Sequence, residues 1–209
     1  MIQSDNENKI YSGGKETRMN IEEKVALSFI PDGSSILDVG CGTGEISAYL
    51  KSKGSRTVGV DFSIEAVKKA RKKGFPVLNL NVDIGLPFKD RQFDYAIAFD
   101  VLEHVFDPMG LIKEMRRVAR RSIFIIPNEF SLAHRARLLF NPMQYREYVD
   151  KGVSKHHTLF SWSLVKLLFD NNITKTVFVC RIPKTNIKFI SKSAFIGNMF
   201  ADCFVFIAN

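Results

Sequence analysis

The hydrophobic positions along this 209-residue chain alternate between short continuous runs and stretches with helical spacing. A continuous apolar run predicts a strand buried on both faces, and apolar residues three or four apart predict an amphipathic helix. Strands are expected at 35–39, 56–61, 76–80, 93–99, 122–126, 174–181 and 202–208. Helices are expected at 21–30, 44–53, from Ser63 to near Gly74, along the stripe from Leu111 to Ala119, and at 161–170.

Strands that alternate with helices predict a three-layer α/β/α fold built on a mainly parallel sheet. The connection over residues 85–90 is rich in turn residues and has little room for a helix. Four carboxylates lie at or just after expected strand ends, namely those of Asp38, Asp61, Asp83 and Asp100. Because ligands of such sheets bind where the parallel strands end, these side chains are expected along one functional edge.

Glycine occupies positions 40, 42 and 44, directly after the first expected strand. Glycine tolerates positive φ and has no side chain to obstruct a ligand, so this turn is expected to bring backbone N–H groups close to a nucleotide-like ligand. Asp61 follows about twenty residues later, where α/β nucleotide sites keep the acid that binds ribose hydroxyls. The nicotinamide spacing G-x-G-x-x-G fails, because Glu45 and Ser47 stand where its third glycine is required.

The pattern D-x-G-x-G-x-G from Asp38 to Gly44 resembles motif I of the class I S-adenosylmethionine (SAM)-dependent methyltransferases. The resemblance continues through Asp61, Asn81–Asp83 and Phe93–Val105, and it covers about residues 30 to 130 in the family's order. It implies SAM as cofactor, S-adenosylhomocysteine as product, and a Rossmann-like, seven-stranded sheet whose last strand is antiparallel. A single domain is expected over residues 1–209, with a mobile segment at 1–20.

The resemblance also implies which residues bind the cofactor. They are Asp38, Gly40, Cys41, Gly42, Gly44, Asp61, Phe62, Asp83, Ile84, Phe99 and Asp100. The glycine loop would lie against the methionine part of SAM, with Asp38 orienting the loop and the ligand's ammonium. Asp61 would accept hydrogen bonds from the ribose hydroxyls. The adenine would meet Asp83 and the Ile84 N–H, and it would lie against Phe62, for which a role in the core is the alternative.

The position after the strand that ends at Phe99 is where the acceptor and the methyl group should meet. SAM is already activated, so a base is needed only if the acceptor must lose a proton. His104 is the candidate base, and a histidine that merely fixes the loop is the alternative. Residues 129–160 are expected to form a substrate lid, with Tyr145 and His157 as acceptor contacts. The neighbouring His156 and His157 lack further ligands, so no metal site is predicted.

The formal charge of +8 bears on the class of partner. Basic residues gather at 68–73 and 116–121, on expected helices or their C-terminal ends, where cations complement the helix dipole. A nucleic acid or an anionic membrane surface is the alternative that this charge supports, but no aromatic interleaving or RNA-binding motif accompanies it. The sequence has no apolar run near the ~20 residues of a membrane span. With no signal-peptide stretch and three scattered cysteines, a cytoplasmic protein is expected.

Residues 114–128 are similar to the corresponding part of MetW-like proteins of methionine biosynthesis. This similarity favours a small-molecule methyl acceptor. Two alternatives stay open: methylation of RNA or protein, and a non-catalytic SAM-binding protein that acts through a partner enzyme. The sequence does not identify the acceptor or the oligomeric state.

Overall fold

The computed structural model describes residues 19–128, 130–132, 135, 157–169, 172–181, 188–193 and 201–209. Within them an eight-stranded sheet runs in the order β3-β2-β1-β4-β5-β8-β6-β7. The strands are β1 (Ser35–Val39), β2 (Arg56–Asp61), β3 (Val77–Asn79), β4 (Phe93–Phe99), β5 (Ala119–Pro127), β6 (Ile173–Arg181), β7 (Lys188–Ser191) and β8 (Ala201–Ala208). Strands β1 to β5 are parallel, and β8 lies antiparallel between β5 and β6.

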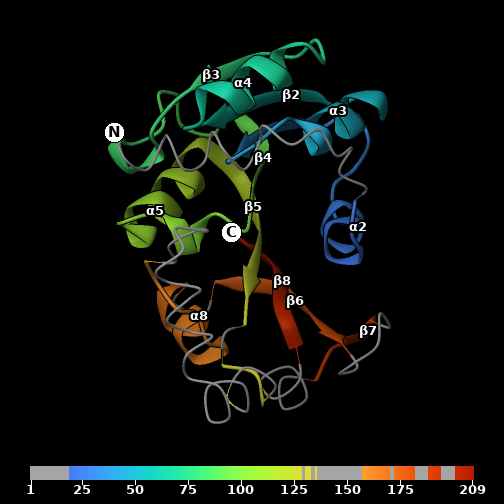
Figure 1. Ribbon diagram of the computed structural model, residues 1–209, viewed down its shortest axis with the longest axis vertical. Coiled ribbons are helices and arrows are strands. Elements are labelled where there is room, and N and C mark those ends of the chain that lie inside the picture. The colour runs from blue at the N-terminus through green and yellow to red at the C-terminus, as the bar shows by residue number, and fades with distance from the viewer. Residues whose placement is uncertain are drawn as a thin grey trace.

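Helices cover both faces of this sheet, which gives the three expected layers. The helices are α2 (Ile21–Leu27), α3 (Glu45–Ser52), α4 (Ile64–Arg71), α5 (Pro108–Val118) and α8 (Trp162–Leu168), with short 3₁₀ turns η1 (Val82–Ile84) and η2 (Leu102–His104). Figure 1 shows α5 and α8 on one side of the sheet and α2 and α3 on the other. Side chains cap the starts of four helices, and these caps are Asn20, Ser63, Asp107 and Ser161. Each cap accepts a backbone N–H that the first helical turn leaves without a partner.

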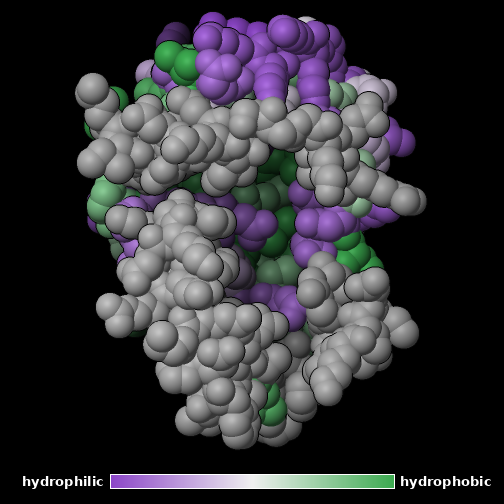
Figure 2. Space-filling view, viewed as in Figure 1, coloured by the Kyte–Doolittle hydropathy of each residue, from purple (hydrophilic) through white to green (hydrophobic). Residues whose placement is uncertain are grey.

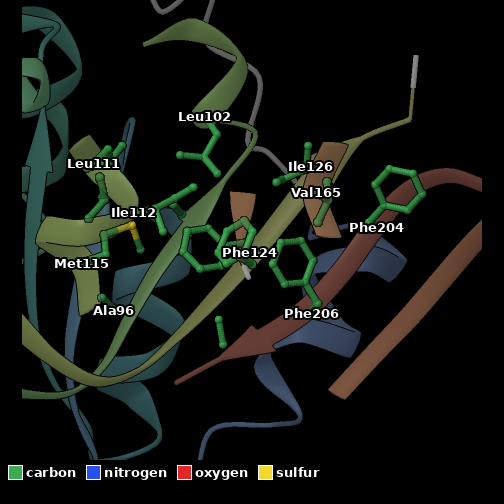
Figure 3. Close-up of a cluster of buried hydrophobic side chains, with 14 of the residues drawn as sticks. Ala96, Leu102, Leu111, Ile112, Met115, Phe124, Ile126, Val165, Phe204 and Phe206 are labelled. Carbon is green, nitrogen blue, oxygen red and sulfur yellow. The ribbon is translucent and has the colours of Figure 1, made fainter. Parts of the chain in front are cut away.

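Strand β5 has apolar side chains on both faces, as its continuous apolar run predicts. Phe124 points to the α5 and α8 side, where its ring stacks on Phe206 with centroids 5.4 Å apart (Figure 3). Its neighbours Ile123 and Ile125 point to the other face and join the core beneath α2. The α5 residue Met115 is fully buried against the first face (Figure 3). The expected α/β/α architecture is therefore confirmed, including the antiparallel strand that ends the chain.

The expected number of seven strands is wrong, because the sheet has an eighth. The additional strand is β7, a four-residue edge strand that pairs antiparallel with β6. Such a short strand carries too few positions for an alternating pattern to be recognised. The helical stripe also ends one residue early, since Ala119 already belongs to β5, where it pairs with Phe93. Arg120 and Arg121 are consequently exposed strand residues and not part of a helix end.

The connection between β3 and β4 contains only η1 and an extended loop, as expected. Arg117 on α5 fixes this loop by donating to the carbonyl oxygens of Phe88 (2.7 Å) and Leu86 (2.9 Å). Glu114, which pairs with the same guanidinium, accepts the Leu86 N–H at 2.9 Å. Arg117 and Glu114 of α5 thus fix the position of the loop between β3 and β4, which contains no α-helix.

Candidate functional site

The glycine loop joins β1 to α3 and is closed by bonds within the protein. The N–H groups of Gly40 and Cys41 both donate to the carbonyl oxygen of Val60 on β2, at 2.8 and 3.0 Å. The N–H of Gly42 donates to Asp61 Oδ2 at 2.7 Å, and the N–H of Gly44 donates to the Cys41 carbonyl at 2.9 Å. The expectation that these groups face a ligand is therefore corrected. The loop offers a close approach of its backbone, and its N–H groups hold its own shape.

Gly44 stands at the start of α3 with φ of 81°, and a Cβ there would lie 2.6 Å from Phe75 Cζ. We predict that Gly44→Ala lowers the free energy of unfolding by about 3 kcal/mol, since backbone strain and overpacking act together. Gly54→Ala is the matched control, because Gly54 has the same φ and open space around it. It should cost only about 1 kcal/mol. Urea unfolding measures the loss of stability in both variants. Equal losses would show that the Phe75 ring moves aside without an energetic penalty.

Asp38 is the acid of the motif, and the residue is 4% exposed. It projects from β1 toward α3, where Ser47 Oγ donates to its Oδ2 at 2.7 Å. Burial raises the pKa of Asp38 to about 7, against the lowering effect of the Ser47 hydrogen bond and with smaller contributions from the charges of Asp61 and Glu23. A buried carboxylate of this kind is stabilised in its ionised form by a cationic ligand.

Asp61 ends β2 and ties two segments to it through backbone donors. Its Oδ2 accepts the Gly42 N–H, and its Oδ1 accepts the Ser63 N–H at 2.8 Å. Burial raises the pKa of Asp61, while these two N–H groups lower it. A carboxylate has about four lone-pair directions, so both oxygens retain the capacity to accept ribose hydroxyls. Asp61 is thus an element of the loop's structure as well as a candidate ligand-binding residue.

A cavity of about 150 Å³ opens where β1 and β4 end, and it brings together five of the expected cofactor residues. They are Asp38, Gly40, Cys41, Phe99 and Asp100. Five further lining residues were not expected from the sequence, namely Met19, Glu23, Thr43, Glu45 and Ile46. Thr43 and Glu45 are neighbours of the motif glycines and could have been inferred. Met19 and Glu23 lie at the start of α2, and only the packing of that helix brings them here.

Two lining residues show how the chain shapes this cavity. Asp100 has φ of 53°, a left-handed conformation that is uncommon outside glycine and is held here by its N–H, which donates to the Ile125 carbonyl at 3.0 Å. Such strain is frequent in residues at functional sites.

Cys41 is buried with its Sγ against Gly59, and burial raises the pKa of its thiol. The thiol therefore stays protonated near neutral pH, which argues against a nucleophilic role.

The expected adenine-side residues follow β2 and β3 along the same edge of the sheet, outside this cavity. Phe62 is half-buried, and Ile84 is 79% exposed. Asp83 is exposed, and its Oδ1 accepts the Phe106 N–H at 2.9 Å and the Asp107 N–H at 3.4 Å. Asp83 thus connects the turn after β3 to the segment that follows η2.

His104 lies half-buried on η2, four residues beyond Asp100, and it is not among the residues that line the cavity. The segment that begins at His157 packs against this turn. The His157 N–H donates to the Glu103 carbonyl at 2.7 Å, and the His157 ring lies 4.2 Å from the Phe106 ring, centroid to centroid. Tyr145, His156, residues 1–18 and most of the expected lid at 129–160 lie outside the described residues.

Much of the basic charge of residues 68–73 has local partners. Figure 2 shows hydrophilic residues gathered at the end of the molecule where α4 lies. There Lys68 pairs with Glu65 at 2.8 Å, Lys73 pairs with Glu45, and Arg71 Nη2 donates to the Val77 carbonyl at 3.0 Å. None of the described helices combines the length and hydropathy needed to cross a bilayer. Within the same residues, no three His, Cys, Asp or Glu side chains form a group suited to a metal ion.

Comparison with known proteins identifies the family. The model of the family described as "Methionine biosynthesis protein MetW" matches residues 21–144, which include the glycine loop and every described lining residue of the cavity except Met19. The chain belongs to the MetW family. It is similar to the bifunctional methionine biosynthesis protein MetXA/MetW of Rhodopirellula baltica, with 35% identity over 120 residues. That match covers 53% of this chain and 19% of the relative.

Other relatives of this MetW-family chain are named as methyltransferases. The ubiquinone biosynthesis O-methyltransferase of Coxiella burnetii is 38% identical over 98 residues, which cover 44% of this chain and 40% of that protein. The chain thus spans less than half the length of either relative. A solved SAM-dependent methyltransferase from Thermotoga maritima covers 90% of this chain and 86% of its own, with a TM-score of 0.69 and 23% identity, and shows the shared fold. The resemblance to class I methyltransferases is confirmed, and SAM is the cofactor that it implies.

The residues of the MetW-family site fit that cofactor chemically. SAM carries an ammonium and a sulfonium against a single carboxylate and is therefore a net cation, and the acidic residues Glu23, Asp38 and Asp100 are among those that line the cavity. A side chain at position 40 would meet Val101 Cγ2 at 2.5 Å, so glycine is required for the loop to keep its close packing. Which of the expected residues contact SAM stays a prediction.

Proposed function

We propose that this chain is a SAM-dependent methyltransferase whose acceptor is a small molecule. The observation that carries the proposal is the cavity at the ends of β1 and β4, which combines a strained strand end with carboxylates around a glycine loop. SAM, when bound, supplies a methyl group on a positively charged sulfur for in-line displacement by an acceptor atom. The protein's contribution is then to hold the ligand, orient it and exclude water.

The residues divide this work according to their positions. Asp38 and the carbonyl groups of Phe99 and Asp100 would hold the ammonium end, and Asp61 would hold the ribose. Phe62 and Asp83 would serve the adenine, whereas the Ile84 N–H, also expected there, donates to the Asn81 carbonyl at 3.3 Å within η1. The acceptor would lie beside η2 and the His157 segment, and His104 would accept a proton from its hydroxyl or amine. Two relatives support a small acceptor by their names, which are ubiquinone biosynthesis O-methyltransferase and demethylmenaquinone methyltransferase.

A second function has its own supporting observation. The chain matches about a fifth of a bifunctional relative whose name joins MetXA to MetW, so a domain of this family occurs in one chain with another biosynthetic part. A SAM-binding protein that acts through a partner enzyme is consistent with this arrangement. Both proposed functions require the chain to bind SAM, but only the first requires it to transfer the methyl group.

Titration calorimetry with SAM, S-adenosylhomocysteine and NAD tests the shared step. We expect both sulfur compounds to bind and NAD not to bind. Methyl transfer from radiolabelled SAM is then measured against hydroxylated and amino metabolites, bulk RNA and a protein extract. Transfer to a small molecule supports the first function. Tight SAM binding without transfer to any of the three classes supports the partner function, and failure to bind SAM contradicts both.

The role of His104 is tested with the acceptor that this assay identifies. We predict that His104→Ala lowers kcat about a hundredfold, at the low end of the range for loss of a general base. The dissociation constant for SAM should stay unchanged, because His104 does not line the cavity with Asp38. Tyr49→Phe, on the exposed side of α3, serves as the control with unchanged kcat. Full activity of His104→Ala would assign this histidine to the structure of the loop.

A further inference from the structure

Helix α2 contributes an acidic residue to the cofactor cavity, although it lies outside the family's glycine motif. Glu23 is half-buried and lines the cavity together with Asp38 and Asp100. The helix is anchored beneath it, where Ala26 and Leu27 are buried against the sheet. The position of Glu23 relative to the ends of β1 and β4 is therefore set by the core.

The Glu23 carboxylate is also fixed locally by a capping box. Its Oε2 accepts the Asn20 N–H at 2.7 Å, and the Glu23 N–H donates to Asn20 Oδ1 at 3.0 Å. One oxygen is thus engaged at the helix start, and the charge of the group is delocalised over both oxygens. A glutamine can replace glutamate in this motif, because its amide oxygen accepts the same N–H. The charge of Glu23 can consequently be removed while its structural role is retained.

The described lining of the cavity has a negative electrostatic character. Its acidic members are Glu23, Asp38, Glu45 and Asp100, and no Lys, Arg or His is among the described lining residues. The negative charge of Glu45 is balanced by Lys73, with which it forms an ion pair. The field of Glu23 reaches the buried end of the cavity, since its charge contributes to raising the pKa of Asp38. A cationic ligand in this space is therefore favoured over a neutral ligand of the same shape.

We propose that Glu23 is a specificity determinant that makes this site favour the positively charged donor SAM over its neutral product S-adenosylhomocysteine. The inference rests on the proposed function, of which it specifies one part. The two ligands share their adenosine and amino-acid ends and differ only in the methyl group and its sulfonium charge. Contacts to the shared ends therefore cancel in the ratio of the two affinities. The contacts of the methyl group and the effect of the positive charge remain, and only the second depends on the charge of Glu23.

The test is titration calorimetry of the full chain with SAM, S-adenosylhomocysteine and sinefungin, whose amine places a cation near the position of the sulfonium. For Glu23→Gln we expect binding of SAM and sinefungin to weaken about tenfold relative to binding of S-adenosylhomocysteine. Glu65→Gln is the matched control. It also removes an acid from the first turn of a helix, but Glu65 lies on α4 and does not line the cavity. Its affinity ratios should equal those of the wild type.

Two results would overturn the proposal, and they are distinguishable. If the wild type binds SAM and S-adenosylhomocysteine but Glu23→Gln weakens both equally or neither, Glu23 does not discriminate between them and the proposed function still stands. If the wild type binds neither ligand, the proposed function fails as well. A measurement on the wild type alone provides a second test, because added salt shortens the screening length from about 10 Å at 0.1 M to about 3 Å at 1 M. The preference for SAM should then decrease, and an unchanged preference would count against the proposal.

Discussion

Asp61→Ala is expected to weaken SAM binding about a thousandfold. The reason is that two hydrogen bonds from ribose hydroxyls to a charged acceptor are lost, each contributing about 1.5–3 kcal/mol, while a factor of ten corresponds to about 1.4 kcal/mol. The same change removes the acceptor of the Gly42 and Ser63 N–H groups. The free energy of unfolding should therefore fall by about 2–4 kcal/mol. Calorimetry and urea unfolding measure the two effects separately.

Asp94→Ala separates binding from folding in this experiment. Asp94 on β4 also accepts bonds from another segment, since its Oδ2 accepts the Ser35 N–H at 3.0 Å and the Ser35 hydroxyl at 2.7 Å. Asp94 lies at the amino ends of β1 and β4, and the glycine loop lies at the carboxyl ends of these strands. The control should lose stability and keep its affinity for SAM. Wild-type affinity in Asp61→Ala would remove Asp61 from the ligand site and leave it as the acid that closes the loop.

Asp38→Asn is expected to stabilise the protein while it weakens SAM binding. The pKa of Asp38 is raised in the folded state from 3.8 to about 7. The stability contribution of its protonated form is therefore fully present below pH 3.8 and is lost as the pH rises through 7. Each pKa unit corresponds to about 1.4 kcal/mol, so the wild type carries a cost of about 4 kcal/mol at pH 8 and about 2 kcal/mol at pH 5. An asparagine, which still accepts from Ser47, avoids this cost.

Urea unfolding of Asp38→Asn at the two pH values measures the difference, with Asp94→Asn as a control of opposite sign. Hydrogen bonds from Ser35 lower the pKa of Asp94, so its contribution is present above the unfolded pKa and is lost as the pH falls. Asp94→Asn should therefore be less stable than the wild type at pH 8, with a smaller difference in acid. Equal effects of Asp38→Asn at both pH values would show that Asp38 is ionised throughout. Unchanged SAM affinity would show that its charge does not serve the ligand.

The features that were predicted correctly depend on short, contiguous segments. The strand, turn and helix from β1 to α3 follow one another directly, so the pattern from Asp38 to Gly44 was sufficient to locate the loop. The direction of its N–H groups was not predictable, because their acceptors are Val60 and Asp61 on the neighbouring strand. Glu23 could be recognised as part of a helix start, but its place in the cavity depends on how α2 packs across the sheet. Tertiary contacts decide both of these features.

The bonds that close the glycine loop also bear on the entropy of ligand binding. Four of its amide groups are already engaged, with two on Val60, one on Asp61 and one on Cys41. A loop whose shape is set by its own chain loses little conformational freedom when a ligand is added, so more of the interaction energy is expressed as affinity. The loop has positive φ at the alternate positions Gly40, Gly42 and Gly44, and strand β2 holds the first part of this backbone through Val60 and Asp61.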